Sequence, residues 1–375
     1  MDMSPDPLLH DAPSMLTAWD ALAADAAEPN CFYAPEMLLP AIRHLTQEKD
    51  VLLLQAWEGE ELIGLLPVTT AHRHGRLPLA NITNWMHQHC FYGAPLIRRG
   101  YERAAWTSFL DVLDKSDWAP NFLHLSTLDG DGANANALKA VCAQQGRGLR
   151  CIHHYERALL QSDLTADAYW ETRIRGKKRK EIRRLQNRLR ELGSVTSQEL
   201  SSEADIPSWC RDFLTLEQSG WKGTEGTAMA CDPAEASFFR ESVTAAFAAE
   251  RLAFLRIDFE GKPIAMLVNF LMGRGGFSFK IAFDETMSRF SPGVLIEIDN
   301  LRRVLNRDDL DWMDSCAAAD HPMIDSLWGE RRQIVQYRVA LRGVGRSIAW
   351  TAADAADRLA SFIKRPRAAE TESSS

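Results

Sequence analysis

The sequence lacks a long apolar run and a secretion signal. Its longest apolar runs, at 51–54 and 62–68, are far shorter than the roughly 20 residues that a membrane-spanning helix needs. Residues 1–13 are acidic and interrupted by prolines, whereas a signal peptide begins with basic residues followed by an apolar stretch. We therefore expect a cytoplasmic protein without a membrane span.

The seven cysteines include no C-x-x-C pair. An odd number of scattered cysteines predicts reduced thiols, because disulfide frameworks and zinc sites use regular spacings. The only metal-like cluster is His87-x-His89-Cys90, which lies on one short segment together with Trp85 and Phe91. We interpret this segment as strand or loop packing and predict no metal site.

Length and composition indicate a globular protein with two domains. The 375 residues exceed the size at which a single core usually keeps growing. Apolar residues make up 46% and charged residues 25% of the chain, which excludes a disordered chain and a membrane-protein composition. A net charge of −8 argues against general nucleic-acid binding.

One basic segment departs from this acidic background. Between Glu171 and Glu191 there are ten Lys or Arg and three Glu. Apolar residues recur there at helical spacing, Gly176 predicts an interruption, and Gly193 predicts the end of the second of two helices. We expect the basic face to contact an anionic substrate, cofactor or membrane surface, and a merely solvated helix face is the alternative.

Two stretches about 200 residues apart share one layout. Each contains a predicted β-hairpin with an acidic-Gly turn, at 51–68 around Gly59 and at 252–268 around Gly261. A helical pattern precedes each hairpin, at 35–45 and 233–249, and another follows, at 102–113 and 294–305. This repetition predicts two related α/β domains with a boundary near residues 150–165, of which the first is expected to supply one wall of a cleft.

The second copy contains a candidate anion site. A strand ending at Phe283 runs through Arg289-Phe-Ser291-Pro-Gly293 into a helical pattern. Free backbone N–H groups and the positive end of a helix dipole converge at such a helix start. A phosphate-bearing cofactor could be held there, and a simple strand-to-helix connection is the alternative.

Together these motifs resemble the CelD/FemAB-like branch of the GNAT acyltransferase superfamily. The resemblance covers residues 163–332 and is carried by R-R-L-x-x-x-L-x-x-x-G ending at Gly193, E-x-x-x-W-K-G from Glu217, F-K-I-A-F-D-E from Phe279, S-P-G-V-L from Ser291 and D-S-C-A-x-x-D-H from Asp314. The usual GNAT cofactor loop is Q/R-x-x-G-x-G/A, and the comparable turn here reads R-F-S-P-G-V. The first half resembles the family's less distinctive N-terminal half.

The resemblance implies an α/β fold with mixed sheets, built as tandem GNAT-like domains. Residues 1–160 would form a degenerate N-terminal domain. Residues 161–350 would form the acyltransferase domain, including the basic helices within 165–193. Residues 366–375 are too polar to pack and are predicted to be a disordered tail.

The resemblance also implies an N-acyltransferase that uses acetyl-CoA. Its acceptor would be an amino group of a sugar or glycan precursor, such as a lipid-linked one, in surface polysaccharide synthesis. We expect peripheral contact with an anionic membrane through residues 173–190, and we expect no specific nucleic acid as a partner. The alternatives are a FemAB-like transferase that uses aminoacyl-tRNA, and a non-catalytic scaffold that docks on a membrane or a synthase.

An amine acyltransferase needs a donor site and a base. For the donor we predict the turn, with Arg289, Ser291, Pro292, Gly293 and Val294. For the base, Glu217 and Asp284 lead, followed by His321 beside Asp320. The structural alternatives are an exposed helical Glu for Glu217, a turn or cap residue for Asp284, and packing or capping for His321.

Three further residues are predicted to contact the acceptor, together with Asp320. Trp221 would stack on the apolar face of a pyranose, and Lys222 would contact a phosphate or carboxylate. Lys280 alternates with apolar neighbours and is expected to point into the cleft. A buried Trp beside a loop and a solvent-facing strand Lys are the alternatives.

Overall fold

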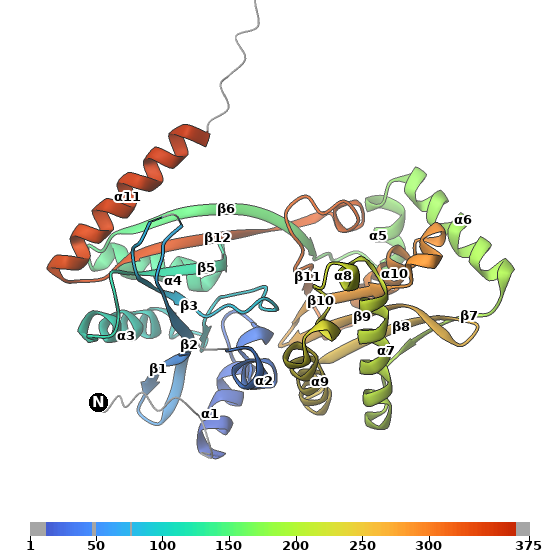
Figure 1. Cartoon of the computed structure of the whole chain (residues 1–375), viewed down its shortest axis with the longest axis horizontal. Coiled ribbons are helices and arrows are strands. Elements are labelled where there is room, and N and C mark those ends of the chain that lie inside the picture. The colour runs from blue at the N-terminus through green and yellow to red at the C-terminus, as the bar shows by residue number, and fades with distance from the viewer. Residues whose placement is uncertain (1–12, 47–49, 76, 365–375) are drawn as a thin grey trace, which may run out of the picture.

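The computed structural model describes residues 13–46, 50–75 and 77–364. The chain forms two halves that lie side by side and share one sheet (Figure 1). The predicted tail, 366–375, lies outside the described residues. The first half contains α1 (Pro13–Ala24), η1 (Cys31–Tyr33), α2 (Pro35–Leu45), β1 (Leu52–Glu58), β2 (Glu61–Ala71), β3 (Asn81–Asn84), β4 (Leu96–Ile97), α3 (Glu102–Lys115), β5 (Phe122–Asp129), α4 (Ala133–Gln144) and β6 (Leu149–Leu160).

The second half follows β6 and ends with elements that return to the first. It contains α5 (Ala166–Arg173), α6 (Gly176–Leu192), β7 (Val195–Glu199), η2 (Glu203–Asp205), α7 (Ile206–Ser219), α8 (Trp221–Thr224), η3 (Met229–Cys231), α9 (Pro233–Ala248), β8 (Leu252–Phe259), β9 (Lys262–Met272), β10 (Gly275–Phe283), η4 (Glu285–Phe290), α10 (Pro292–Leu305), β11 (Trp312–Asp314) and η5 (Ile324–Ser326). The returning elements are β12 (Glu330–Ala340) and α11 (Val344–Lys364).

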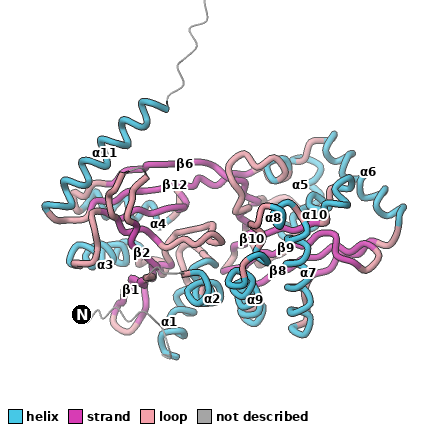
Figure 2. Tube along the Cα trace, viewed as in Figure 1, coloured by secondary structure: helices cyan, strands magenta, loops and turns pink. Residues whose placement is uncertain are grey.

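The described strands form one mixed sheet across both halves. Their order is β1-β2-β3-β5-β12-β6-β11-β10-β9-β8-β7, and β4 pairs with β2 beside this path. The long strands β6 and β12 run along the top of the view and link the halves (Figures 1 and 2). β12 pairs with β5 and β6, whereas the end of β6 pairs with β11. The sheet is therefore continuous through the predicted boundary at 150–165.

Both predicted hairpins and their flanking helices are present. In the first hairpin Glu58 pairs with Glu61, and in the second Phe259 pairs with Lys262, so each loop has two residues. Such tight loops need a residue with positive φ, and Gly59 (φ 60°) and Gly261 (φ 74°) supply it. The mixed α/β fold class predicted from the sequence is confirmed.

Helices cover both faces of the sheet in the second half. Alternate residues of β8 and β9 face opposite sides, as strand geometry requires. Phe254 and Val268 pack in a core that includes residues of α7 and α9 and extends into the first half. Leu255 and Leu267 pack in a second core with residues of α5, α6 and α10. The halves thus share an apolar core, which holds the site between them in a fixed geometry.

The basic segment forms the two predicted helices, α5 and α6, and Gly176 begins the second. α6 buries Ile182, Leu185 and Leu189 and ends at Gly193. The Arg179 guanidinium donates to the carbonyl oxygens of Glu171 and Ile174, at 2.5 and 2.6 Å, which satisfies acceptors at the end of α5. Within the described residues, no helix has the length and apolar composition needed to cross a bilayer.

Candidate functional site

Glu217 lies buried in the last turn of α7, at the seam between the halves. α7 begins with Pro207 in its first turn, buries one apolar face and ends before Gly220. One carboxylate oxygen, Oε2, accepts the Met229 amide at 2.9 Å. The other, Oε1, lies 3.1 Å from Lys222 Nζ and 3.5 Å from Lys280 Nζ. Both oxygens are therefore engaged, and the carboxylate holds two ammonium groups together.

The two lysines reach Glu217 from different elements. Lys222 comes from the short helix α8, and Lys280 comes from β10. Burial lowers the pKa of Lys280, while the Glu217 carboxylate acts in the opposite direction. The Lys222 side chain is 27% exposed and that of Lys280 is 12% exposed. Their ammonium groups can therefore meet an anionic ligand at the seam while Glu217 stays covered.

The first half contributes the loop His87-Gln88-His89 to the same region. His89 Nε2 lies 2.8 Å from Glu235 Oε2 on α9, and Gln88 Nε2 donates to the other oxygen of Glu235. The His89 ring stacks on Phe238 of α9, with 5.6 Å between ring centroids. We call five residues at this interface the seam cluster: Glu217, Lys222, Lys280, His89 and Glu235.

Both histidines of this loop are neutral. Burial lowers the pKa of His87 to about 3, and burial together with Lys280 lowers that of His89 to about 2. The contact with the Glu235 carboxylate requires a proton on His89 Nε2, so Nδ1 carries none. His89 Nδ1 is buried and has no hydrogen-bond partner among the residues that the structure describes. The sequence prediction that this loop packs and binds no metal stays a prediction.

Trp221 lies at the exposed edge of the seam cluster. It begins α8, and its side chain is 54% exposed. Its amide donates to Glu285 Oε1 of η4 at 2.8 Å, which ties α8 to the segment preceding the predicted donor turn. Gly223 makes α8 fit against α7, because a Cβ there would lie 1.7 Å from the Gln218 carbonyl oxygen.

The predicted donor turn begins α10. Ser291 adopts a left-handed conformation (φ 51°) and precedes Pro292. The amides of Val294 and Leu295 both donate to the Ser291 carbonyl oxygen, at 2.9 and 3.1 Å, and proline has no N–H. Among the described residues, Gly293 is therefore the residue in the first turn of α10 whose backbone amide is still free to bind an anion. Arg289, four residues before Gly293 in the chain, is exposed, with its guanidinium 4.7 Å from the Phe290 ring centroid.

The sheet opens next to this turn. β10 pairs in parallel with β11 only from Gly275 to Phe277. Beyond Phe277, β10 continues to Phe283 with β9 as its partner among the described strands. The side of β10 that faces away from β9 is therefore unpaired beside Lys280. An extended ligand can bind such an edge through main-chain hydrogen bonds.

The other predicted bases make local structural bonds. Asp284 Oδ1 caps η4 by accepting from the Thr286 amide at 2.9 Å and hydroxyl at 2.7 Å. His321 Nδ1 accepts the Ile324 amide at 3.5 Å, and Asp320 is exposed with φ 56°. In the described residues, no hydrogen bond or ion pair joins these three side chains to the seam cluster. Their catalytic and binding roles stay predictions.

A buried ion network fixes the halves beside the seam cluster. Asp314 of β11 is fully buried and lies 2.7 Å from Arg157 Nε of β6. This contact is an ion pair whose N–H is not aligned for a hydrogen bond, whereas Arg157 Nη2 does donate to Asp314 Oδ2 at 2.8 Å. Arg332 of β12 bridges Asp314 and Asp129 of β5, at 2.8 and 2.9 Å. These charges connect the two halves of the sheet directly.

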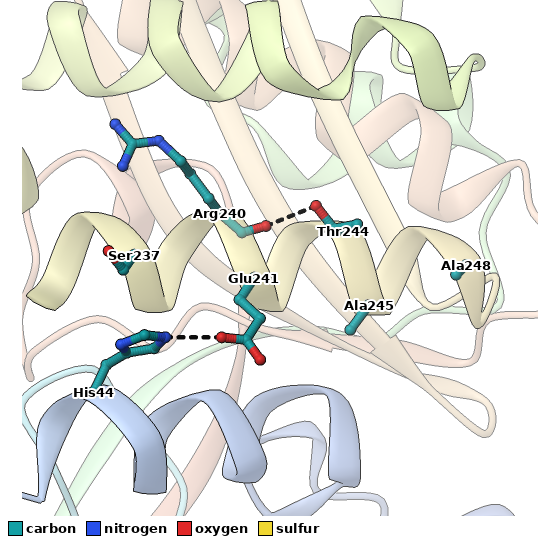
Figure 3. A pocket seen from close by; sticks show the side chains of 7 residues that line it. All are labelled: His44, Ser237, Arg240, Glu241, Thr244, Ala245 and Ala248. Carbon is teal, nitrogen blue, oxygen red and sulfur yellow. Dashed lines mark hydrogen bonds and ion pairs between the residues drawn. The ribbon is translucent and has the colours of Figure 1, made fainter.

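A surface groove between α2 and α9 marks a second contact of the halves (Figure 3). It is lined by His44, Ser237, Arg240, Glu241, Thr244, Ala245 and Ala248. His44 Nε2 lies 2.8 Å from Glu241 Oε2, and Arg43 forms an ion pair with the other oxygen. Glu241 stands six residues after Glu235 on α9, about 9 Å along the helix. This groove is therefore separate from the seam cluster.

Sequence reasoning did not name Glu235 or His89 as site residues. Glu235 reads as an ordinary acidic residue in the first turn of a helix, and His89 as part of a packed loop. The two residues are 146 positions apart, so no local spacing joins them. The useful signal was the duplicated layout, because it predicts that the first half forms one wall of a site in the second.

Residues 176–321 match the model of the acetyltransferase (GNAT) domain family. None of the curated proteins matches the chain. Within the described part, no three His, Cys, Asp or Glu side chains are grouped so that they could hold a metal ion.

Solved structures resemble nearly the whole chain. FemX has a TM-score of 0.58 at 8% identity, covering 88% of this chain and 96% of FemX. The C-terminal domain of a putative lysylphosphatidylglycerol synthetase from Agrobacterium fabrum has a TM-score of 0.52 at 12% identity. The match covers 90% of this chain and 95% of that domain. L-PGS from Bacillus licheniformis has a TM-score of 0.52 at 11% identity, and the match covers 94% of this chain and 98% of L-PGS. Residues 176–321 thus match an acetyltransferase (GNAT) domain, and the chain has a fold similar to that of FemX.

Proposed function

We propose that the protein transfers an acetyl group from acetyl-CoA to an amino group of a sugar or glycan precursor, in the cytoplasm, during surface polysaccharide synthesis. The observation that carries this proposal is the seam cluster. Two ammonium groups meet at one buried carboxylate, between the halves of a chain with a GNAT domain and beside the opening between β10 and β11.

The opening in the sheet suits the extended arm of an acyl-CoA donor. The unpaired edge of β10 offers main-chain hydrogen bonds to that arm. At the end of β10, Arg289 and the Gly293 amide would face the pyrophosphate. Because the first turn of α10 leaves one amide, that of Gly293, without a partner among the described residues, we expect Arg289 to contribute much of the phosphate affinity.

The exposed edge of the seam cluster suits an anionic amino sugar. The Trp221 ring offers a stacking surface for a pyranose. Lys222 and Lys280 would take a phosphate or carboxylate of the acceptor, such as the diphosphate of a nucleotide- or lipid-linked sugar. Glu217 would keep both ammonium groups in place before the acceptor binds.

The basic face of α6 suits contact with an anionic membrane. Lys177, Lys180, Arg184 and Arg188 are exposed, and no ion pair of theirs occurs among the described residues. Each basic residue near such a surface is worth about 1 kcal/mol. This contact would bring a lipid-linked acceptor close to the seam cluster.

A transferase that uses aminoacyl-tRNA is the second candidate. The same basic face and the fold similarity to FemX and to a putative lysylphosphatidylglycerol synthetase favour it. A steep loss of tRNA binding as salt rises, with no binding of acetyl-CoA, would support this candidate over the first. A scaffold would instead bind vesicles of anionic lipid and cleave no thioester.

Two measurements test the first candidate. The first is calorimetry with acetyl-CoA, and the second is an acetylation assay on a panel of amino sugars and their nucleotide-linked forms. We expect Arg289→Glu to weaken acetyl-CoA binding roughly tenfold or more, because a charge-assisted contact to phosphate is lost. Arg211→Glu, at an exposed position on α7, is the control and should bind as the wild type does. Absence of binding by the wild-type protein, or equal binding by all three, would refute the donor assignment.

A further inference from the structure

Glu235 lies in the seam cluster, where its carboxylate contacts the loop His87-Gln88-His89 of the first half. It lies in the first turn of α9, after Asp232, whose side chain caps the helix by accepting the Ala234 amide. Its side chain is 15% exposed, so water or a substrate can still reach the carboxylate. Its electrostatic neighbours include Lys280, which stands on the unpaired edge of β10.

The partners of Glu235 leave its carboxylate basic. The two groups that hydrogen-bond to it, from Gln88 and neutral His89, are uncharged donors of the first half. Glu217 differs, because its oxygens contact two ammonium groups and an amide. Neutral donors stabilise the charged form of a carboxylate less than a cation would, so Glu235 keeps its affinity for a proton.

The other charged groups around Glu235 leave the pKa of its carboxyl above the ordinary value. Burial raises the pKa of Glu235; Lys280 lowers it, whereas Asp232 on its own helix and Glu217 on α7 raise it. Lys222 on α8 contributes to the lowered pKa of His89. A raised carboxyl pKa brings a general base closer to the working pH, where it is more effective.

We propose that Glu235 is the general base of the acyl transfer, and that Gln88 and His89 of the first half are positioning residues for it. This inference rests on the proposed function. The acceptor ammonium gives one proton to Glu235, and the freed amine forms a bond to the thioester carbonyl carbon. The carbon–sulfur bond breaks, the CoA thiolate leaves and takes the second proton lost by the nitrogen, and Glu235 releases its proton to solvent. The first half would then complete the site rather than only cover it.

Glu235→Gln tests the proposal, with Glu241→Gln as a matched control. Glu241 also lies on α9 and also accepts from a histidine of the first half, at 2.8 Å (Figure 3). We expect Glu235→Gln to lower kcat for an amino sugar about 10²- to 10⁴-fold with unchanged acetyl-CoA binding. We expect Glu241→Gln to keep the wild-type rate. The fall in rate at acidic pH should disappear in Glu235→Gln, because protonation of Glu235 causes it.

Aminooxy analogues of the same sugars give a second readout. Their nucleophilic nitrogen is uncharged at neutral pH and needs no base to expose its lone pair. Glu235→Gln should therefore acetylate them at close to the wild-type rate, and equal losses on amino and aminooxy acceptors would overturn the proposal. A wild-type protein that acetylates no amine would overturn the proposed function, and the inference with it, whereas full activity of Glu235→Gln would overturn this inference alone.

His89 can be tested separately as a positioning residue. His89→Gln keeps a neutral N–H donor and should retain most of the rate. His89→Leu removes the donor that stabilises the carboxylate, so the acidic limb of the pH profile should move to higher pH. An unchanged limb in His89→Leu would show that His89 only packs.

Discussion

Glu297 provides the sharpest physical test of the folded structure. It lies in α10, three residues after Val294 of the predicted donor turn, and only 2% of its surface is exposed. Asn300 Nδ2 donates to its Oε2 at 3.3 Å, and Asn269 Nδ2 donates to Asn300 Oδ1 at 2.9 Å. Burial raises the pKa of Glu297 to about 7, because these neutral contacts do not replace the water that a carboxylate loses.

The raised pKa of Glu297 makes the free energy of unfolding depend on pH, through proton linkage. A folded-state pKa above the unfolded value means that the folded protein binds more protons between the two values, so its free energy of unfolding falls as pH rises. The difference between a pKa of about 7 and the ordinary glutamate value of 4.5 corresponds to about 3 kcal/mol in total. About 2 kcal/mol of this is expected between pH 5 and pH 8.

Glu297→Gln removes this titration while keeping an oxygen that can accept from Asn300. Urea unfolding of the wild type and the variant at pH 5 and pH 8 measures the effect, and other titrating groups cancel in the comparison. We expect the variant to gain about 2 kcal/mol relative to the wild type on going from pH 5 to pH 8. Glu181→Gln, at an exposed position on α6, is the control. If the difference between wild type and variant did not change with pH, the assignment of a buried, titrating Glu297 would be wrong.

Two other substitutions test how the seam cluster is held. Gly223→Ala places a methyl group on the Gln218 carbonyl oxygen, so α8 must move. We expect a large loss of kcat/KM in the acetylation assay with only a small change in melting temperature, whereas Gly176→Ala, which meets no atom closer than 4.0 Å, should change neither. Arg157→Met leaves Asp314 buried with Arg332 as its remaining ionic partner. We expect a cost of about 3–5 kcal/mol in urea unfolding, partly recovered by adding Asp314→Asn; equal stability of the single and double variants would contradict this account.

The sequence by itself determined the local elements. Hairpin turns depend on residues that tolerate positive φ, so Gly59 and Gly261 identified both hairpins. Helices depend on a 3.6-residue period of apolar side chains, and this period located α2, α9, α10 and the pair α5 and α6. The family resemblance was also determined at this level, because its motifs are short and contiguous.

Only the tertiary structure decided which of these elements meet. β12 returns to the first half and places Arg332 beside Asp314 and Asp129, although its sequence reads only as a strand. The contact of Glu235 with His89 depends on how α9 docks on the first half. Such contacts arise from packing between surfaces distant in sequence, and local periodicity and turn chemistry carry no information about them. The chemical setting of Glu217, Lys222 and Lys280 was decided in the same way, by burial at the seam.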